Sequence, residues 1–358
     1  MSTQDAQPFC FVLKEENLSQ SDSSLPSKAL DSYLRGKISG LTGPLSVEPI
    51  PGGQSNPTYF ITYGERRMVL RKKPPNALPS AHAIDREFRI MSALGAIGLK
   101  VPETVLYCDD EEIIGTPFYM MNRIEGRVFA DCALPDVSAS DRRIMYMDMA
   151  DTLAGLHNVD WQAAGLGDFG KPGNYFSRQI GRWTKQWQLS KGVESEDIEH
   201  LLAWLPANIP TGDNTAISHG DFRIGNLIFH PTEPQVVGIL DWELSTLGHP
   251  LADVAYSALG WHLQTTEHMG MRDLDYRSLG IPIEQDYLER YYCSSSSEER
   301  VQPFHFAFSL FRLAVIFEGI AARARLGNAS ADNASEVGKL STVLARRAVE
   351  EISYNRAD

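Results

Sequence analysis

The sequence predicts an α+β fold of two lobes, in which a small antiparallel sheet with one helix precedes a larger helical part. Its 358 residues are many for one domain and natural for two. Between residues 47 and 121, short apolar segments alternate with turn residues, as antiparallel strands do. After Gly126 the apolar residues recur at helical spacing instead. Strands and helices segregated along a chain are typical of an α+β arrangement with a cleft between the parts.

The small lobe is predicted at residues 29–122, after a flexible tail at 1–28 that is rich in Ser, Gln and acidic residues. It opens with an amphipathic helical pattern at 29–41, and a second helical pattern follows at 84–94. The strands are expected at 47–50, 59–62, 68–71, 104–107 and 118–121, where β-branched and aromatic residues lie between turn signals.

The large lobe is predicted at residues 123–358 and is mostly helical. One segment, 303–326, is apolar on nearly every side, which indicates a helix buried in the lobe. Helices are expected at 140–158, 174–190, 195–206, 252–263, 303–326 and 334–354. The first of these should face the core with Ile144, Met147, Ala150, Leu153 and Leu156.

The composition excludes some kinds of partner. A formal net charge of −13 argues against nucleic acid or an anionic membrane, because both reward positive charge. No apolar run reaches the length of a membrane span, and the first residues lack the pattern of a signal peptide. The 4 cysteines are scattered and have no metal-ligand spacing, so they are expected to be thiols in a reducing compartment. We therefore expect a cytoplasmic enzyme.

Three oxygen-bearing side chains carry the chemistry of the sequence: Asp221, Asn226 and Asp241. An Asp with an Asn five residues later is the spacing of a kinase catalytic loop. In phosphoryl transfer, one carboxylate accepts the proton of the attacking hydroxyl, while an amide oxygen and a second carboxylate hold magnesium. The sequence thus predicts a catalytic Asp221 and a magnesium site at Asn226 and Asp241.

Turn or cap chemistry is the alternative for each of these residues. Against it, two short apolar segments, 227–229 and 236–240, flank a turn between Pro231 and Pro234. Such a pattern predicts a hairpin that folds the end of the second strand back beside the start of the first. The hairpin would bring Asp241 next to Asn226, which favours the catalytic interpretation.

With these motifs the chain resembles the aminoglycoside phosphotransferase family, small-molecule kinases with a two-lobed protein-kinase-like fold. The resemblance covers residues 29–350 and rests first on His219-Gly220-Asp221-Phe222-Arg223-Ile224-Gly225-Asn226 with Ile239-Leu240-Asp241-Trp242-Glu243. Three further tracts resemble a subgroup associated with acyl-CoA dehydrogenases: Ser245 to Tyr256, Gly53-Gln54-Ser55-Asn56, and Leu70-Arg71-Lys72-Lys73-Pro74-Pro75 with Ile84-Asp85-Arg86-Glu87-Phe88.

The resemblance implies roles around the predicted base. His219 would brace the catalytic loop by hydrogen bonds, and Asp253 would support the loop from the large lobe. Arg223 would neutralise phosphate or contact an anionic substrate, and a surface charge is its alternative. Glu243 would orient a metal-bound water or face solvent.

The small lobe must supply a cation for the nucleotide phosphates. Strand alternation places Val69 and Arg71 on one face and Lys72 on the other. If Val69 faces the adenine, then Arg71 binds the phosphates, and a register error of one residue would give that role to Lys72. Glu87 would pair with this cation, and the alternative is an exposed helix charge.

A glycine-rich loop and a connecting strand complete the predicted nucleotide site. The loop consists of Gly52, Gly53, Gln54, Ser55 and Asn56, and its glycines would let backbone N–H groups approach phosphate oxygens. The resemblance further implies that the Asn122 carbonyl and the Ile124 amide bond the edge of the adenine.

The acceptor site is predicted on the helical segment 174–190. Arg178, Arg182 and Lys185 form one basic face there, and Tyr175 lies at its start. Such a face in an acidic chain suits an acidic or phosphate-bearing substrate, for example a coenzyme A thioester. An amphipathic helix with solvated charges is the alternative.

The function predicted from the sequence is an ATP- and magnesium-dependent O-phosphotransferase of a small hydroxylated metabolite, such as a hydroxy acid or hydroxyacyl-CoA, with a functional link to an acyl-CoA dehydrogenase. Two alternatives stay open. One is a nucleotide-binding regulatory module without catalysis, and the other is an aminoglycoside antibiotic kinase, which would need an acidic acceptor site.

Overall fold

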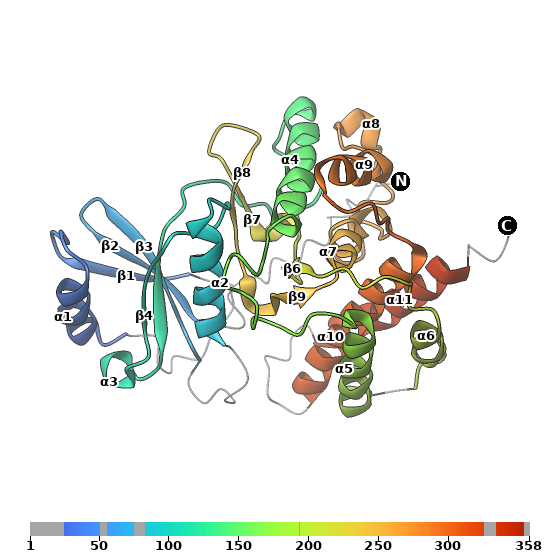
Figure 1. Cartoon of the computed structure of the whole chain (residues 1–358), viewed down its shortest axis with the longest axis horizontal. Coiled ribbons are helices and arrows are strands. Elements are labelled where there is room, and N and C mark those ends of the chain that lie inside the picture. The colour runs from blue at the N-terminus through green and yellow to red at the C-terminus, as the bar shows by residue number, and fades with distance from the viewer. Residues whose placement is uncertain (1–24, 51–55, 75–82, 193, 326–333, 354–358) are drawn as a thin grey trace, which may run out of the picture.

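The computed structural model describes residues 25–50, 56–74, 83–192, 194–325 and 334–353. Within them the chain forms a small sheet lobe and a larger helical lobe (Figure 1), as the sequence predicts. The boundary between residues 122 and 123 and the tail at 1–28 stay predictions. Of that tail, the structure describes Leu25 onward, and the Leu25 side chain is buried in the small lobe.

The small lobe is a five-stranded antiparallel sheet with the order β1-β2-β3-β5-β4. Its strands are β1 (Leu45–Pro49), β2 (Thr58–Tyr63), β3 (Arg66–Lys72), β4 (Thr104–Cys108) and β5 (Phe118–Asn122). All five lie where the sequence predicts them. Its helices are α1 (Ser27–Lys37), α2 (Ile84–Ala96) and the one-turn α3 (Glu111–Ile114), which begins where only a turn was expected because the Asp110 side chain caps it.

The two faces of this sheet pack against different partners. Met68 and Leu70 of β3 belong to the core with α1, whereas Val69 belongs to the main core, which also holds residues of α2 and the large lobe. Figure 1 shows α2 between the sheet and the large lobe, with α1 on the outer side. The alternation of β3 thus directs Val69 and Arg71 toward the cleft side, as predicted.

The large lobe contains α4 (Ala139–His157), α5 (Tyr175–Ser190), α6 (Glu196–Ala207), α7 (Pro250–Ser257), α8 (Tyr276–Leu279), α9 (Glu284–Ser294), α10 (Pro303–Arg325) and α11 (Ala334–Ser353). Two of these, α8 and α9, were not predicted. The helix expected at 252–263 starts earlier, at Pro250, and ends at Ser257, and a single 3-10 turn, η3 (Leu259–Trp261), follows it.

The buried face of α4 differs from the prediction. Ile144 is 48% exposed and Met147 is only partly buried, while Met145 and Met149 are buried. The helix packs against α9 and also against the strands β6 (Ala216–Ser218) and β8 (Val236–Ile239). Apolar residues are therefore needed around most of it. A helix buried on several sides has no single apolar stripe, and its inward residues cannot be assigned from spacing alone.

The long helix α10 is the centre of the large lobe and packs against α5, α6, α7 and α11. By length and composition alone it would be able to cross a membrane, contrary to the sequence-based expectation that no segment would. Of its most apolar window, 83% is buried inside the fold. Its apolar character is accounted for by packing on several helices, as predicted for 303–326.

Four short strands position the segment that carries Asp221, Asn226 and Asp241. The predicted hairpin is confirmed as β7 (Leu227–Phe229) paired with β8 (Val236–Ile239). A second pair, β6 (Ala216–Ser218) with β9 (Thr246–Gly248), was not predicted because three-residue strands give almost no periodic signal. The lobe connection lies on the hairpin at Gly126, where a Cβ atom would collide with Ile228 and with the Phe229 carbonyl.

Candidate active site

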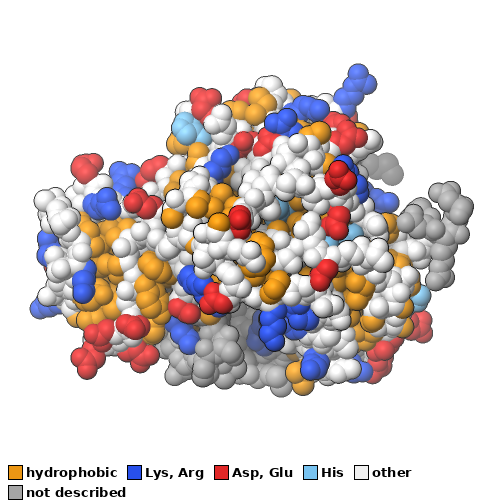
Figure 2. All heavy atoms as spheres, viewed as in Figure 1, with side chains coloured by type: hydrophobic (Ala, Val, Ile, Leu, Met, Phe, Trp, Pro, Cys, Tyr) orange, Lys and Arg blue, Asp and Glu red, His pale blue; other side chains and the backbone are white. Residues whose placement is uncertain are grey.

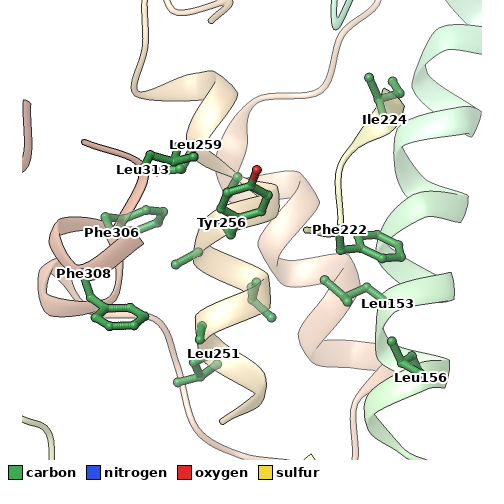
Figure 3. Packing of buried hydrophobic residues seen from close by; sticks show 14 of the residues in the cluster. Leu153, Leu156, Phe222, Ile224, Leu251, Tyr256, Leu259, Phe306, Phe308 and Leu313 are labelled. Atoms are coloured by element: carbon green, nitrogen blue, oxygen red, sulfur yellow. The ribbon is translucent and has the colours of Figure 1, made fainter. Parts of the chain in front are cut away.

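Asp221 lies between β6 and β7 with its carboxylate held by three neighbours. Oδ2 accepts a 2.7 Å hydrogen bond from the Asn226 amide, which also donates to the Asp221 carbonyl at 2.8 Å. Oδ1 accepts a hydrogen bond from the Tyr256 hydroxyl and lies 3.5 Å from Arg223 Nε. Figure 3 shows the Tyr256 oxygen directed away from the apolar residues of α7. A carboxylate oriented in this way is ready to accept a hydroxyl proton.

His219 and Asp253 support the loop that carries Asp221. His219 is fully buried; its Nδ1 accepts from the Asp221 N–H at 3.2 Å, so its Nε2 must be the protonated nitrogen that donates to Leu240 O at 2.9 Å. Burial lowers the pKa of this imidazole. Asp253 accepts from the Gly220 N–H and the Ser218 hydroxyl, both at 2.9 Å. Both residues therefore have the bracing geometry that the sequence predicts.

Asn226 and Asp241 are brought together by the hairpin, as expected. The Leu240 N–H donates to Asn226 O at 2.8 Å, which fixes the backbone between the two residues. Asp241 has a φ of 65°, in the left-handed region that Asp and Asn tolerate better than most residues. No group of three His, Cys, Asp or Glu side chains suited to a metal occurs among the described residues. An amide oxygen and a carboxylate are the hard ligands that suit magnesium, which usually keeps several waters.

Arg71 reaches the segment that carries Asp241 from the small lobe. Its Nε lies 3.2 Å from Glu87 Oε2, and one of its terminal nitrogens donates to Asp241 Oδ1 at 3.1 Å. Glu243 is 3.7 Å away. Burial alone would lower the pKa of this guanidinium, but the neighbouring carboxylates raise it above its ordinary value. The predicted pairing of Arg71 with Glu87 is confirmed.

Glu87 is buried on α2 with only 1% of its surface exposed. Its oxygens accept from the Asn56 amide at 2.8 Å and from the Tyr119 hydroxyl at 3.0 Å. Burial raises the pKa of this carboxyl, while Arg71 and these hydrogen bonds act in the opposite direction. The alternative of an exposed helix charge is therefore wrong.

The predicted adenine contacts lie around the lobe connection. Val69 is buried in β3 opposite Met121, and Ile124 packs against Gly238, where a Cβ would lie 2.7 Å from Ile124 Cδ1. The Asn122 N–H donates to Glu103 O at 2.8 Å. Gly52, Gly53, Gln54 and Ser55 lie outside the described residues, and Asn56 directs its amide to Glu87 rather than outward.

Arg223 is turned into the site and is not a surface charge. Its side chain is 32% exposed, and it lies over Asp221 and beside Gly225, where a Cβ would collide with the guanidinium. The same side chain lines a small cavity with Tyr256. It is placed to contact an anionic group near the base, as the sequence suggests.

The basic face of α5 exists as predicted, with one exception. Arg178, Arg182 and Lys185 line an open hollow together with Ser177 and Gln186, and Figure 2 shows Lys and Arg side chains gathered over α5 and α10. Tyr175 does not join them. Its ring is buried against Gly248 and Phe308, because the first turn of α5 packs on the catalytic segment.

Two buried charged residues of α10 have different roles. Arg312 is buried; it donates to the Gly220 carbonyl, and its guanidinium lies 5.6 Å from the Tyr256 ring and 5.8 Å from the Trp183 ring. Glu318 is internally paired, since it accepts from Arg325 at 2.7 Å and from the Gly192 N–H at 2.8 Å. Arg312 thus connects the catalytic loop with α5.

The family of the chain follows from its similarity to known proteins. Residues 46–290 match the model of the phosphotransferase enzyme family. The chain belongs to this family. The chain is 44% identical over 331 residues to mouse acyl-CoA dehydrogenase family member 10, a match that covers 91% of the chain and 31% of the relative. The chain therefore spans about a third of the length of that relative.

Solved structures agree with the family. A crystal structure from Ralstonia eutropha JMP134, provisionally named an aminoglycoside phosphotransferase, is 42% identical with a TM-score of 0.84 and covers 92% of this chain and 99% of its own. Spectinomycin phosphotransferase APH(9)-Ia, solved with ADP and spectinomycin, shares the fold at 11% identity and a TM-score of 0.60, covering 90% and 98%. The kinase-like two-lobed fold predicted from the sequence is thus confirmed.

The roles of two residues in the site were not predicted from the sequence. Tyr256 bonds Asp221, and its place on α7, three residues after Asp253, would have put both residues on the same side of a helix. Asn56 was assigned to the phosphate loop, whereas its amide supports Glu87. Only the tertiary pairing of the loop with α2 reveals that contact, so no local signal was available.

Proposed function

We propose that the chain is an ATP- and magnesium-dependent O-phosphotransferase that acts on a small hydroxylated molecule. The observation that carries the proposal is the convergence of Asp221, Asn226 and Asp241 with the Arg71–Glu87 pair across the two lobes. Each part matches a requirement of phosphoryl transfer: a base, oxygen ligands for a cation, and a cation for the phosphates.

In the proposed reaction, the acceptor hydroxyl attacks the γ-phosphorus of ATP. A new oxygen–phosphorus bond forms, the bond to the β–γ bridging oxygen breaks, and ADP leaves with that electron pair. Asp221 accepts the hydroxyl proton, and the Tyr256 and Asn226 hydrogen bonds keep its carboxylate oriented toward the acceptor. Arg71 neutralises phosphate charge while Glu87 fixes its position.

Magnesium would be held by Asn226 and Asp241, and it would supply charge neutralisation for the phosphate oxygens. Arg71 contacts Asp241 directly, so the nucleotide and its cation would rearrange this ion pair on binding. Arg71 would then turn toward the phosphates while keeping Glu87.

We further propose an acidic acceptor such as a hydroxy acid or a hydroxyacyl-CoA thioester. The cations on the acceptor side of Asp221 support this proposal, namely Arg223, Arg312 and the face of α5 with Arg178 and Arg182. The name of the mouse relative, an acyl-CoA dehydrogenase family member, fits an acyl-linked substrate and a functional link to such a dehydrogenase. A cytoplasmic location is part of the same proposal.

Two other functions are less well supported. An aminoglycoside is polycationic and would require an acidic acceptor site, whereas the described residues around Asp221 on this side are basic, and Glu318 is already paired with Arg325. A regulatory module without catalysis would not need Asp221, Asn226 and Asp241 together, and all three are present in bonded geometry.

The proposal is tested by nucleotide binding and by transfer. ATP with magnesium should raise the melting temperature, because a ligand at a hundred times its Kd adds about 2.7 kcal/mol of stability. Asp221→Asn should keep this stabilisation and lose phosphoryl transfer by about 10²–10⁴-fold, measured by mass spectrometry on a panel of hydroxy acids, their coenzyme A thioesters, sugars and aminoglycosides. Absence of any nucleotide-dependent shift would refute the proposal, and binding without transfer to any acceptor would favour the regulatory module.

A further inference from the structure

A small cavity is lined by two of the three side chains that contact the proposed base. Its volume is about 20 Å³, and those two side chains are Arg223 and Tyr256. The lining also includes Met149 on α4, Gly260 in η3, and Met269 and Met271 on the following loop. A cavity of this volume holds roughly one water or one methyl-sized group.

The part of the cavity lined by the methionines is apolar even though hydroxyl groups occur in the lining. The Tyr146 hydroxyl donates to the Cys132 carbonyl at 2.6 Å, and the Ser257 hydroxyl bonds the Tyr287 hydroxyl. Both groups are therefore satisfied by the protein and have little to offer a polar ligand. What remains for a ligand is thioether and methylene surface, which favours hydrocarbon over water.

Arg223 and Tyr256 give the lining a polar part. The Tyr256 hydroxyl and Arg223 Nε both approach Asp221 Oδ1, the Arg223 nitrogen at 3.5 Å. These two side chains therefore connect the cavity with the proposed base, while the methionines give the lining its apolar part.

We propose that this cavity, the alkyl slot, binds a short hydrocarbon segment that continues beyond the hydroxyl-bearing carbon of the acceptor. The inference rests on the proposed function, since it takes Asp221 as the group that meets the hydroxyl. It makes the acceptor a secondary alcohol, with one part of its chain in the slot and its acidic part outside. Methionine side chains are unbranched and adaptable, so the slot can lengthen by rotation of Met149, Met269 or Met271.

Gly260 sets the depth of the slot. A Cβ at this position would lie 3.0 Å from the Met269 carbonyl and 3.2 Å from Met271 Cε, closer than ordinary contact. Gly260→Ala should therefore shorten the slot. Met149→Ala should lengthen it, because it removes a side chain from the wall while α4 stays in place.

The test uses the full chain and straight-chain hydroxy acids of the 3-, 4- and 5-hydroxy series, free and as coenzyme A thioesters. Each series carries zero, one, two or four carbons beyond the hydroxyl-bearing carbon. For the unmodified protein, kcat/KM should rise about fourfold with each of the first carbons, the value of one buried methylene, and then fall. Met149→Ala should move the maximum to longer tails and Gly260→Ala to shorter ones. Met145→Ala is the matched control, since Met145 is equally buried on α4 but does not line the slot, and it should leave the order of substrates unchanged.

A binding measurement separates this inference from the proposed function. Straight-chain carboxylates without a hydroxyl, from butyrate to octanoate, are titrated by calorimetry into the unmodified protein, Met149→Ala and Met145→Ala. Affinity that depends on chain length and shifts only in Met149→Ala supports the slot, even if no hydroxy acid is phosphorylated and the proposed acceptor class fails. Chain-length profiles that are the same in all variants, in turnover and in binding, overturn the slot whether or not transfer occurs.

Discussion

At the scale of single residues, the site depends on charges that are buried and closely matched. Glu87 has almost no exposed surface, and its oxygens are bonded by Asn56, Tyr119 and Arg71. Removing one member of such a set leaves the others desolvated without compensation. Stability and nucleotide binding are therefore linked at this position, and variants must be chosen so that the two can be separated.

Arg71→Met should cost about 3–5 kcal/mol of stability, because it leaves a buried carboxylate without its cation. The double variant Arg71→Met with Glu87→Gln should recover most of that stability, since the Gln side chain needs no cation. Neither variant should bind ATP tightly. Chemical denaturation measures the first effect and calorimetric titration with ATP and magnesium the second. If the double variant regained nucleotide affinity, Arg71 would not be the phosphate-binding cation.

Tyr256→Phe should lower kcat by about 10- to 100-fold, since a hydrogen bond to a charged group contributes about 1.5–3 kcal/mol. The KM for ATP and the melting temperature should change little, because the ring and its packing remain. Tyr287→Phe, which removes another buried hydroxyl that bonds Ser257, is the control and should leave kcat unaltered. Equal losses in both variants would indicate a general packing effect.

Site residues were predictable from the sequence where they lie close together in the chain at a recognisable spacing. Asn226 and Asp241 flank one hairpin, and Asp221 lies five residues before Asn226, so spacing and strand pairing were sufficient. Tyr175 was misplaced because helical spacing does not tell which face the tertiary fold covers, and its ring packs on Gly248. The contact of Arg312 with the Gly220 carbonyl joins residues 92 positions apart, and a single sequence contains no signal for it.

At the scale of elements, one partly buried histidine contacts α9, α10 and α11 of the large lobe. His262, just after η3, bonds Glu284 at the start of α9 and Glu351 on α11, each at 2.8 Å, and its ring lies on Phe306 of α10. Because both ring nitrogens face carboxylates, both must donate, which requires the protonated form. Burial alone would lower the pKa of His262, but the two carboxylates raise it to about 9.

The raised pKa fixes the direction of a pH effect. The folded state holds the proton more tightly than the unfolded state, so the stabilisation is complete below about pH 6.5 and is lost as the pH rises through 9. His262→Gln should therefore lower the free energy of unfolding by roughly 3 kcal/mol more at pH 6 than at pH 10. Urea denaturation at several pH values measures this difference.

His200→Gln provides the comparison, because His200 is exposed on α6. A pH profile of His262→Gln that runs parallel to that of the unmodified protein would contradict the assignment of a charged imidazole. The prediction concerns only how α9, α10 and α11 are held together, so activity is not needed to test it.

Elements were predictable to the extent that their burial is one-sided. The strands of the small lobe have alternating or continuous apolar patterns and were found in place. The inner face of α4 was assigned wrongly at Ile144 because the helix is covered by α9, β6 and β8 together. The four-residue α8 and the three-residue strands β6 and β9 are too short to show a periodic pattern, and β6 and β9 are defined by their hydrogen bonds to each other.

At the scale of the whole molecule, the lobes are joined on two sides. One is the chain connection at Gly126, and the other is α2, where Arg86 donates to the Phe169 carbonyl at 2.7 Å and the Ser245 carbonyl at 3.3 Å. The Arg86 guanidinium also lies 4.1 Å from the Phe169 ring. Since α2 carries Glu87 next to this residue, the contact fixes Arg71 and Asp241 relative to each other.

Arg86→Ala should raise the KM for ATP several-fold, because the lobes would hold the phosphate cation less firmly against the metal ligands. The melting temperature should fall only slightly, because the apolar core shared by α2 and the large lobe stays in place. Arg89→Ala, one turn along α2, removes exposed contacts with Asp168 and the Gly165 carbonyl and should have a much smaller effect on both quantities, because these contacts are screened by solvent and do not involve the residue next to Glu87. A similar KM in the two variants would contradict the role of Arg86 as the link between the lobes.

One backbone feature narrows what can replace Asp241, the proposed metal ligand. That role would need a negative oxygen, and the φ of 65° must also be tolerable to the residue that stands there. Glutamate has the charge but is strained in that conformation, glycine has the conformation without the charge, and asparagine offers an oxygen and the conformation but no charge. Two unrelated demands thus leave one amino acid that meets both. A substitution to asparagine would preserve the backbone conformation of the site and remove the negative charge. By this single change an enzyme of this fold would most easily lose catalysis and become a protein that only binds its nucleotide.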